Sequence, residues 1–355
     1  MTNRCMIHSA KMPSPFSRRS ACRLAQAVFC MENLEQRRLM STYVVTVGGD
    51  GTTGHTLRWA VGQVNINNGG TIDLTGESGT INLTQTPGVL ELTSSSSSPV
   101  VIEGPGSSDL TISANNSSAV FQVDNLVNAS ISDLTITDGH TTGDGGDIFN
   151  DGATLTLANC NLTDGTAADG GGIYSSGNLT MSGCTLGGVT TATADSSTND
   201  GGAIYTSGDL TADDCSVQNC VATDYGGGVQ IDAGDASFQG CSILDSQAVN
   251  GEGGAISTLS TDSTTLDHCT IDGDSAVNDA AGGIDAGGTG QVIIRDSTIS
   301  NCSAFTGGGI EIDGSVSLSQ CSVFDNSAYN GGGIATYGAL DASYCSISDN
   351  KGSLG

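Results

Sequence analysis

Residues 170–186 read GGGIYSSGNLTMSGCTL, and residues 201–217 read GGAIYTSGDLTADDCSV. The two stretches match at the Gly cluster, at the aliphatic residue after it and at the Cys near the end. Within the first, the apolar positions Leu179, Met181, Cys184 and Leu186 follow steps of two, three and two residues. Steps of two are the period of a β-strand, and the step of three adds one residue that bends the chain. The pattern therefore predicts short strands joined by corners.

This unit recurs along most of the chain. The aliphatic residue after the Gly cluster occurs eight times, at intervals of 24 to 31 residues: Ile148, Ile173, Ile204, Val229, Ile256, Ile284, Ile310 and Ile334. One coil of this kind cannot bury its own inner face, but coils stacked about 4.8 Å apart give every strand two hydrogen-bonded neighbours. The Gly clusters suit tight corners that need φ > 0. The repeat predicts an all-β solenoid of parallel strands with about 24–31 residues per coil.

The ends of the chain differ from the repeat. Residues 1–41 form a basic segment with seven of the 10 Lys and Arg residues, and we expect it to be a targeting segment that is disordered or removed. Residues 42–123 are expected to hold an N-terminal cap and irregular first coils, with a short amphipathic helix over 56–65. Residues 124–355 are expected to form the regular coils. No capping element follows the last repeat, so we expect a truncated or open end there, available for end-to-end contact.

Several stretches resemble known families. Residues 56–61 (TLRWAV), 102–106 (IEGPG) and 131–139 (ISDLTITDG) are similar to the opening of bacterial right-handed parallel β-helix proteins. Gly201–Ile204 and Gly253–Ile256 resemble the Gly-Gly-Ala-Ile motif of polymorphic outer-membrane protein repeats, although that family's Phe-x-x-Asn motif is nearly absent. Leu34–Ser41 resembles the Leu-Glu-Pro-Arg-x-Leu-Leu-Ser segment of large bacterial surface proteins. These resemblances imply a right-handed parallel β-helix and export to the cell surface or the extracellular space.

The charge of the repeat region excludes some partners. Residues 41–355 contain 36 acidic and three basic side chains, a formal charge of −33. Such a polyanion repels nucleic-acid phosphates and anionic membranes. No stretch approaches the roughly 20 apolar residues of a membrane-spanning helix. We therefore expect neither a nucleic-acid partner nor a membrane span.

The cysteines predict a ladder of buried thiols. Of the 12 Cys residues, seven share one position of the repeat, and Ser297 occupies it once: Cys160, Cys184, Cys215, Cys241, Cys269, Cys321 and Cys345. Side chains stacked in parallel register are about 4.8 Å apart, too far for the Cβ separation of a disulfide. We expect free thiols at these positions.

The candidate site residues are few. Arg295 is the one basic side chain in the repeats that a lyase could use as a base, and a solvated or ion-paired Arg is the alternative. Tyr174 and Tyr205 follow consecutive anchors and could bind a sugar on an outer face, a platform that Gln230 would end. Asp169, Asp200 and His140 could bind Ca²⁺, although Asp also favours such corners by bonding local amides. No cofactor is expected to be required, and Ca²⁺ stays an open candidate.

Two classes of function follow. The chain is expected to be an exported, cell-surface or extracellular scaffold of the adhesin type without an identifiable catalytic site, binding a carbohydrate or a surface protein. The alternative is a polysaccharide lyase or glycoside hydrolase that acts on an acidic polysaccharide, a hypothesis that rests mainly on fold analogy. An extracellular nuclease is a third hypothesis, which the negative charge disfavours.

Overall fold

The computed structural model describes residues 41–46, 48–86, 88–94, 98–190 and 193–353. The predicted export segment, including all but the last residue of 34–41, lies outside the described residues. The boundary expected at residues 123 and 124 stays a prediction. No described helix is long and apolar enough to cross a membrane.

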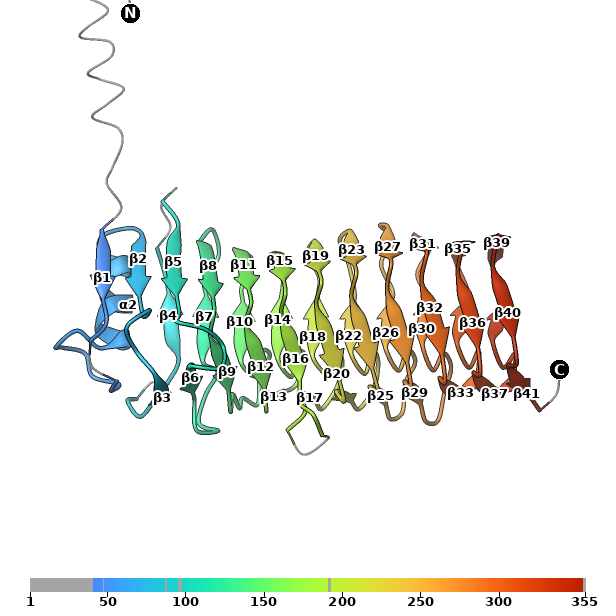
Figure 1. The fold of residues 1–355 in the computed structure, drawn as a ribbon, viewed down its shortest axis with the longest axis horizontal. Coiled ribbons are helices and arrows are strands. Elements are labelled where there is room, and N and C mark those ends of the chain that lie inside the picture. Colours follow the sequence, from blue (N-terminus) through green and yellow to red (C-terminus); the bar gives the residue numbers. More distant parts are fainter. Residues whose placement is uncertain (1–40, 47, 87, 95–97, 191–192, 354–355) are drawn as a thin grey trace, which may run out of the picture. The chain divides into compact units, whose positions relative to one another are not determined.

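Four parallel sheets run along the unit formed by residues 41–355, and successive strands of each sheet come from successive coils (Figure 1). Sheet A has 12 strands: β1 (Thr42–Val44), β2 (Gly70–Asp73), β5 (Val100–Glu103), β8 (Asn128–Ser132), β11 (Thr154–Ala158), β15 (Asn178–Ser182), β19 (Leu210–Asp213), β23 (Ala236–Gln239), β27 (Thr264–Asp267), β31 (Gln291–Arg295), β35 (Ser315–Ser319) and β39 (Ala339–Ser343). Sheet B has 11 strands: β3 (Gly79–Asn82), β6 (Leu110–Ser113), β9 (Thr135–Thr137), β12 (Asn161–Thr163), β16 (Thr185–Gly187), β20 (Ser216–Gln218), β24 (Ser242–Leu244), β28 (Thr270–Asp272), β32 (Thr298–Ser300), β36 (Ser322–Phe324) and β40 (Ser346–Ser348).

The other two sheets complete each coil. Sheet C has ten strands: β4 (Leu90–Leu92), β7 (Phe121–Val123), β10 (Ile148–Asn150), β14 (Ile173–Ser175), β18 (Ile204–Thr206), β22 (Val229–Ile231), β26 (Ile256–Thr258), β30 (Ile284–Ala286), β34 (Ile310–Ile312) and β38 (Ile334–Thr336). Sheet D has eight strands: β13 (Thr166–Ala167), β17 (Ser196–Ser197), β21 (Val221–Ala222), β25 (Gln247–Ala248), β29 (Ser275–Ala276), β33 (Ser303–Thr306), β37 (Ser327–Asn330) and β41 (Lys351–Gly352). A regular coil passes through sheets C, A, B and D in that order. The predicted parallel solenoid is therefore confirmed, and the short strands of sheet D are an element that the sequence pattern did not indicate.

Equivalent apolar residues align from coil to coil and fill the interior. Ile173 pairs with Ile204, and Leu179 pairs with Leu210; all four side chains are at most 1% exposed. The corner before each strand of sheet C depends on glycine. Gly170 has φ +62°, and a Cβ there would lie 2.2 Å from the carbonyl oxygen of Ile173, so no other side chain fits without distortion.

The predicted helix closes the N-terminal end of the stack. The helix α2 (Leu57–Ile66) begins after Thr56, whose hydroxyl accepts a hydrogen bond from the backbone N–H of Trp59. Leu57 and Val64 are fully buried, and Trp59 packs against the core with Tyr43 at an edge-to-face distance of 6.0 Å. The helix thus covers apolar surface that the first coil would otherwise expose.

The cysteine ladder is present as predicted. Among the described residues nine cysteines are free thiols; eight of them are buried and Cys345 is partly exposed. Cys241 donates to the carbonyl oxygens of Ala212 and Gln239, at 3.3 and 3.4 Å, which shows how a small polar side chain is satisfied at this position. Ser297 does the same with the carbonyl oxygen of Arg295.

A second interior column consists of polar residues directly before the strands of sheet D. Each member is 0% exposed: Asp195, Cys220, Ser246, Asp274, Cys302 and Asn326. Three of their side chains accept a hydrogen bond from the backbone N–H at the same position of the preceding coil: Gly165 N–H to Asp195 Oδ1 (2.9 Å), Ser246 N–H to Asp274 Oδ1 (2.7 Å) and Cys302 N–H to Asn326 Oδ1 (2.9 Å). This column stabilises the stacking of coils, and it places two carboxyl groups inside the solenoid.

Candidate functional site

The outward-facing residues in the middle of the sheet C strands form one column. Each follows the inward-facing anchor of its strand, which is Phe121 in β7 and an aliphatic residue in the other strands, so strand alternation turns its side chain outward. From the N-terminal end the column reads Glu91, Gln122, Phe149, Tyr174, Tyr205, Gln230, Ser257, Asp285, Glu311 and Ala335. Between Phe149 and Glu311 it changes from aromatic to acidic.

Three aromatic rings stack along this column. The Phe149 and Tyr174 ring centroids are 5.3 Å apart at an interplanar angle of 20°, and those of Tyr174 and Tyr205 are 5.1 Å apart at 2°. The sequence pattern had singled out Tyr174 and Tyr205, and parallel pairing does bring them together. It missed Phe149, although the same rule, one residue after the anchor Ile148, identifies it. We call Phe149, Tyr174 and Tyr205 the aromatic stack.

A pocket opens at the Phe149 end of the aromatic stack. Phe149 and Gln122 line it from the column, and Ser117, His140 and Asp144 line it from the neighbouring loops. Its volume is about 680 Å³. Phe149 stacks on Tyr174 on one side, and its other neighbour in the column is Gln122, so the pocket lies where a fourth ring of the stack would be. Hydroxyl, amide, imidazole and carboxylate groups thus surround one aromatic ring.

Carboxylates flank the aromatic stack on both sides. Asp169 and Asp200 precede the Gly clusters, and each also bonds the backbone of the next coil: Asp200 N–H to Asp169 Oδ1 at 3.1 Å and Tyr225 N–H to Asp200 Oδ1 at 2.9 Å. Burial, followed by the charge of Asp169, raises the pKa of Asp144. Burial, followed by the charge of Asp144, raises the pKa of the Tyr174 hydroxyl. The surroundings of the stack are strongly anionic, and its carboxyl groups repel one another.

The acidic end of the column is more enclosed. Asp285 and Glu311 pair on adjacent strands and are 2% and 8% exposed. The Ser257 hydroxyl donates to Asp285 Oδ2 at 2.9 Å, whereas Glu311 Oε2 is buried without a hydrogen-bond partner. Burial, together with the charge of Glu252, raises the pKa of Glu311 to about 7 and that of Asp285 well above its usual range. The sequence reasoning missed both residues, although each follows an anchor Ile.

The structure brings His140 and the two predicted Ca²⁺ candidates to the same region but not into one cluster. His140 lies in the pocket, and Asp169 and Asp200 lie along the aromatic stack. Within the described part of the chain, three ligand atoms of His, Cys, Asp or Glu come within 4.8 Å of one another at one place only, Asp267, His268 and Asp296. The proposed Ca²⁺ ligands Asp169, Asp200 and His140 therefore do not form a preformed cluster.

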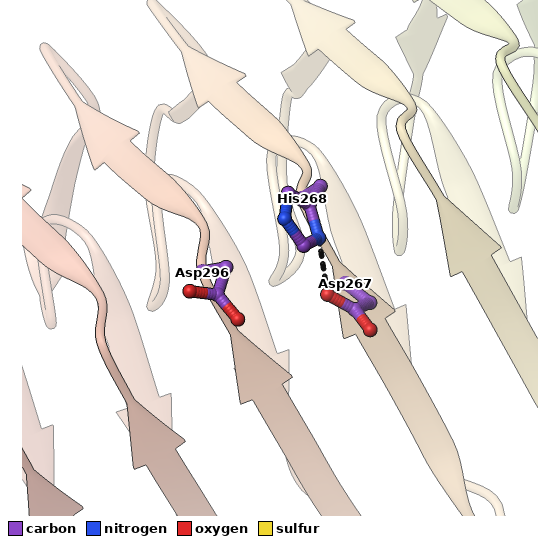
Figure 2. Close-up of side chains that lie close together, drawn as sticks. All are labelled: Asp267, His268 and Asp296. Atoms are coloured by element: carbon purple, nitrogen blue, oxygen red, sulfur yellow. Dashed lines mark hydrogen bonds and ion pairs between the residues drawn. The ribbon is translucent and has the colours of Figure 1, made fainter.

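Figure 2 shows that group at the corner between sheets A and B, with Asp267 and His268 on one coil and Asp296 on the next. His268 Nδ1 and Asp267 Oδ1 are 2.6 Å apart, and the His268 side chain is 64% exposed. His268 and Asp296 both have positive φ, at +54° and +49°. They occupy the left-handed corner position that Asp133 and Asn159 hold in earlier coils, so turn geometry accounts for their placement.

The left-handed corners also explain another row of acids. Asp138, Asp164, Asp245, Asp325 and Asp349 all have φ between +53° and +61°. Asp tolerates this conformation better than most residues, so these positions are corner residues. Arg295, the candidate base, ends β31 in sheet A, beside Asp267 of the preceding coil. The aromatic stack and the acidic pair belong to sheet C, a different face of the coil.

Comparison with known proteins agrees with the fold. The family model for the right handed beta helix region matches residues 188–352. The fold of this chain is a right-handed parallel β-helix. The β-helix also has a structural match to the Azotobacter vinelandii mannuronan C-5 epimerase AlgE6 A-module, with 13% sequence identity and a TM-score of 0.31, over 87% of this chain and 100% of that one. A TM-score this low carries no argument about activity. No curated protein sequence matches the β-helix.

Proposed function

We propose that this β-helix protein binds a glycan chain on the outer face of sheet C, with a sugar ring in the pocket beside Phe149. The observation that supports this proposal is that the aromatic stack ends in a pocket lined by hydroxyl, amide, imidazole and carboxylate groups. A sugar ring has an apolar face and an equatorial belt of hydroxyls. One aromatic ring with polar groups around it matches both features.

The repeat extends this site along the solenoid. Phe149, Tyr174 and Tyr205 belong to three successive coils, and the next member of the column, Gln230, is buried, so the accessible platform spans three coils. An extended polymer can contact several coils at once, whereas a small molecule fills the pocket alone. The site therefore favours a polysaccharide or oligosaccharide, and an adhesin-type role at a cell surface is part of the proposal. Export rests on the resemblance of residues 34–41 to surface-protein segments.

A panel of immobilised neutral, basic and acidic glycans tests the proposal with the full chain. We expect binding that Phe149→Ala weakens about tenfold, because the ring supplies the apolar face of the pocket. Phe305→Ala is the matched control: Phe305 stacks on Tyr329 at 5.2 Å, is 54% exposed and belongs to sheet D. Glycan binding that is equally sensitive to both variants, or to neither, would contradict the site.

Glycan hydrolysis is a second candidate because of one observation. The Glu311 carboxyl, with a pKa of about 7, lies beside Asp285, and a carboxyl group that keeps its proton near neutral pH can act as a general acid. It ranks second because the two side chains are 8% and 2% exposed, so a substrate would have to displace the groups around them. Release of reducing ends that Glu311→Gln abolishes would establish it. A lyase that uses Arg295 has no comparable support, because Arg295 is in sheet A.

A further inference from the structure

The charge around the aromatic stack is of one sign. Burial raises the pKa of both tyrosine hydroxyls, and nearby carboxylates raise it further. For Tyr174 these are Asp144, Asp169, Asp151 and Asp232, and for Tyr205 they are Asp232 and Asp169. Asp200 adds a further carboxylate next to Asp169, whose Oδ1 accepts the backbone N–H of Asp200. These groups come from both sides of the column and from several coils, so their combined charge extends along the stack.

No Lys or Arg side chain of the described residues lies at the stack to balance it. The described residues contain three Lys or Arg side chains, of which Arg58 forms an ion pair with Asp50 at 2.6 Å near the N-terminal helix. Arg295 is in sheet A, and Lys351 is in β41 of sheet D. A polyanionic glycan would meet unscreened repulsion here, at close range and between partly buried groups.

The carboxylates at the stack do not form a preformed cluster for a metal ion. Ca²⁺ takes six to eight oxygen ligands at about 2.3–2.6 Å, from carboxylates, carbonyl groups and waters that converge on one point. Among the described residues, no three acidic or His ligand atoms at the stack lie within 4.8 Å of one another. Carboxylates that are spread beside aromatic rings instead suit an organic cation, which gains from the rings as well as from the charges.

One hydrogen-bond acceptor of the column also lacks a partner. Gln230 follows Tyr205 on the next strand and is 1% exposed, and its Oε1 atom is buried without a donor. Leaving a buried acceptor unpaired costs about 1–3 kcal/mol. A hydroxyl or ammonium group that displaced the groups covering Gln230 would remove that cost, so the unpaired acceptor favours a donor-rich ligand next to Tyr205.

We infer that the glycan bound along the aromatic stack is cationic, a chain of amino sugars whose ammonium groups pair with Asp144, Asp169 and Asp200. The inference rests on the proposed glycan site and specifies its ligand class. Repeated ammonium groups match repeated carboxylates, so that several weak contacts act together on one chain. A cationic glycan thus takes the place of the acidic polysaccharide that fold analogy suggests as the ligand.

Calorimetric titration of the full chain with three matched hexamers tests the inference. They are fully deacetylated chitohexaose, the N-acetylated form of the same chain, and a hexagalacturonate. We expect the deacetylated hexamer to bind at least tenfold more tightly than the others at a pH where its amines are protonated, with an affinity that falls as salt is added. In Asp144→Asn/Asp169→Asn the preference should drop about three- to tenfold, whereas Asp213→Asn, an exposed residue of β19, should leave it unchanged.

The outcomes separate the inference from the function on which it rests. Equal binding of the deacetylated and N-acetylated hexamers, lost in Phe149→Ala, would overturn the cationic ligand and keep the glycan site. Hexagalacturonate binding that needs Ca²⁺ would also overturn it, in favour of a metal-bridged acidic glycan. If Phe149→Ala changes the binding of none of the three, both proposals are wrong.

Discussion

Asp195 should make the β-helix less stable as the pH rises from 4 to 7, and Asp195→Asn should reduce the slope by the share of this one carboxyl. Burial also raises the pKa of Asp147, Asp274, Asp285 and Glu311, so part of the slope remains. The side chain is 0% exposed inside the coils. Its two oxygens accept the backbone N–H groups of Gly165 and Gly187, both at 2.9 Å, and no Lys, Arg or His among the described residues forms an ion pair with it. Burial raises the pKa of Asp195 from its ordinary value of 3.8 to about 7.

The sign and size of the effect follow from this shift. Between pH 3.8 and about 7 the folded chain holds a proton on Asp195 that the unfolded chain has lost. Each pH unit in this window therefore costs about 1.4 kcal/mol of unfolding free energy, a total of about 4 kcal/mol at pH 7. The stabilisation is complete below the unfolded pKa and is lost as the pH rises through the folded one.

Urea unfolding followed by far-ultraviolet circular dichroism, repeated between pH 4 and pH 8, measures this slope. Asn keeps one acceptor but turns an amide N–H₂ toward the other backbone donor, a cost of about 1–3 kcal/mol that does not depend on pH. The variant should thus be less stable than the wild type at pH 4 and more stable at pH 7. Asp213→Asn, on the outer surface, should keep the wild-type slope. Parallel curves for the wild type and Asp195→Asn would show that the burial argument is wrong.

Three further results are expected from the same unfolding assay and from thiol chemistry. Gly170→Ala should destabilise the β-helix by more than 2 kcal/mol, because it forces a Cβ against the Ile173 carbonyl, whereas Gly62→Ala in α2, where nothing lies within 4 Å, should stabilise it by about 0.5–1 kcal/mol; similar values for both would refute the corner argument. Ile256→Ala should cost about 2–5 kcal/mol, since the side chain is 0% exposed, while Thr265→Ala, in an outward position of β27, should change stability by less than about 0.5 kcal/mol. In a chain with Cys5→Ser, Cys22→Ser and Cys30→Ser, a thiol reagent should label at most Cys345 before urea is added, because the eight other thiols are buried; rapid labelling of several sites would contradict the buried ladder.

The repeat made most of the fold predictable. Strand alternation and the extra residue at each corner are local properties, and an aliphatic anchor such as Ile204 marks the same inward position in every coil. Parallel stacking then follows, because one coil cannot bury its own inner face. The helix at 56–65 and the free thiols were predictable for the same reason, from spacing alone. Sheet D was missed because its strands of two to four residues are too short to show a period.

The site was only partly predictable. Tyr174 and Tyr205 were identified because they follow consecutive anchors, and parallel register indeed stacks them. Phe149, Asp285 and Glu311 satisfy the same rule, but their different side-chain types hid the shared position. The pocket could not be predicted, since His140 and Asp144 reach Phe149 from a loop whose path no period fixes.

The sequence by itself thus determined the kind of fold, the residues that face inward and the negative charge of the surface, because each of these depends on local alternation or on composition. Only the tertiary structure decided which outward residues share one face. It also showed that Asp195 lies inside the coils with no ion-pair partner in the part of the chain that is described, and that the aromatic stack ends in a pocket lined by Asp144 and His140. The physical reason is that burial and electrostatic interaction depend on neighbours about one coil away, 24 to 31 residues apart in the chain.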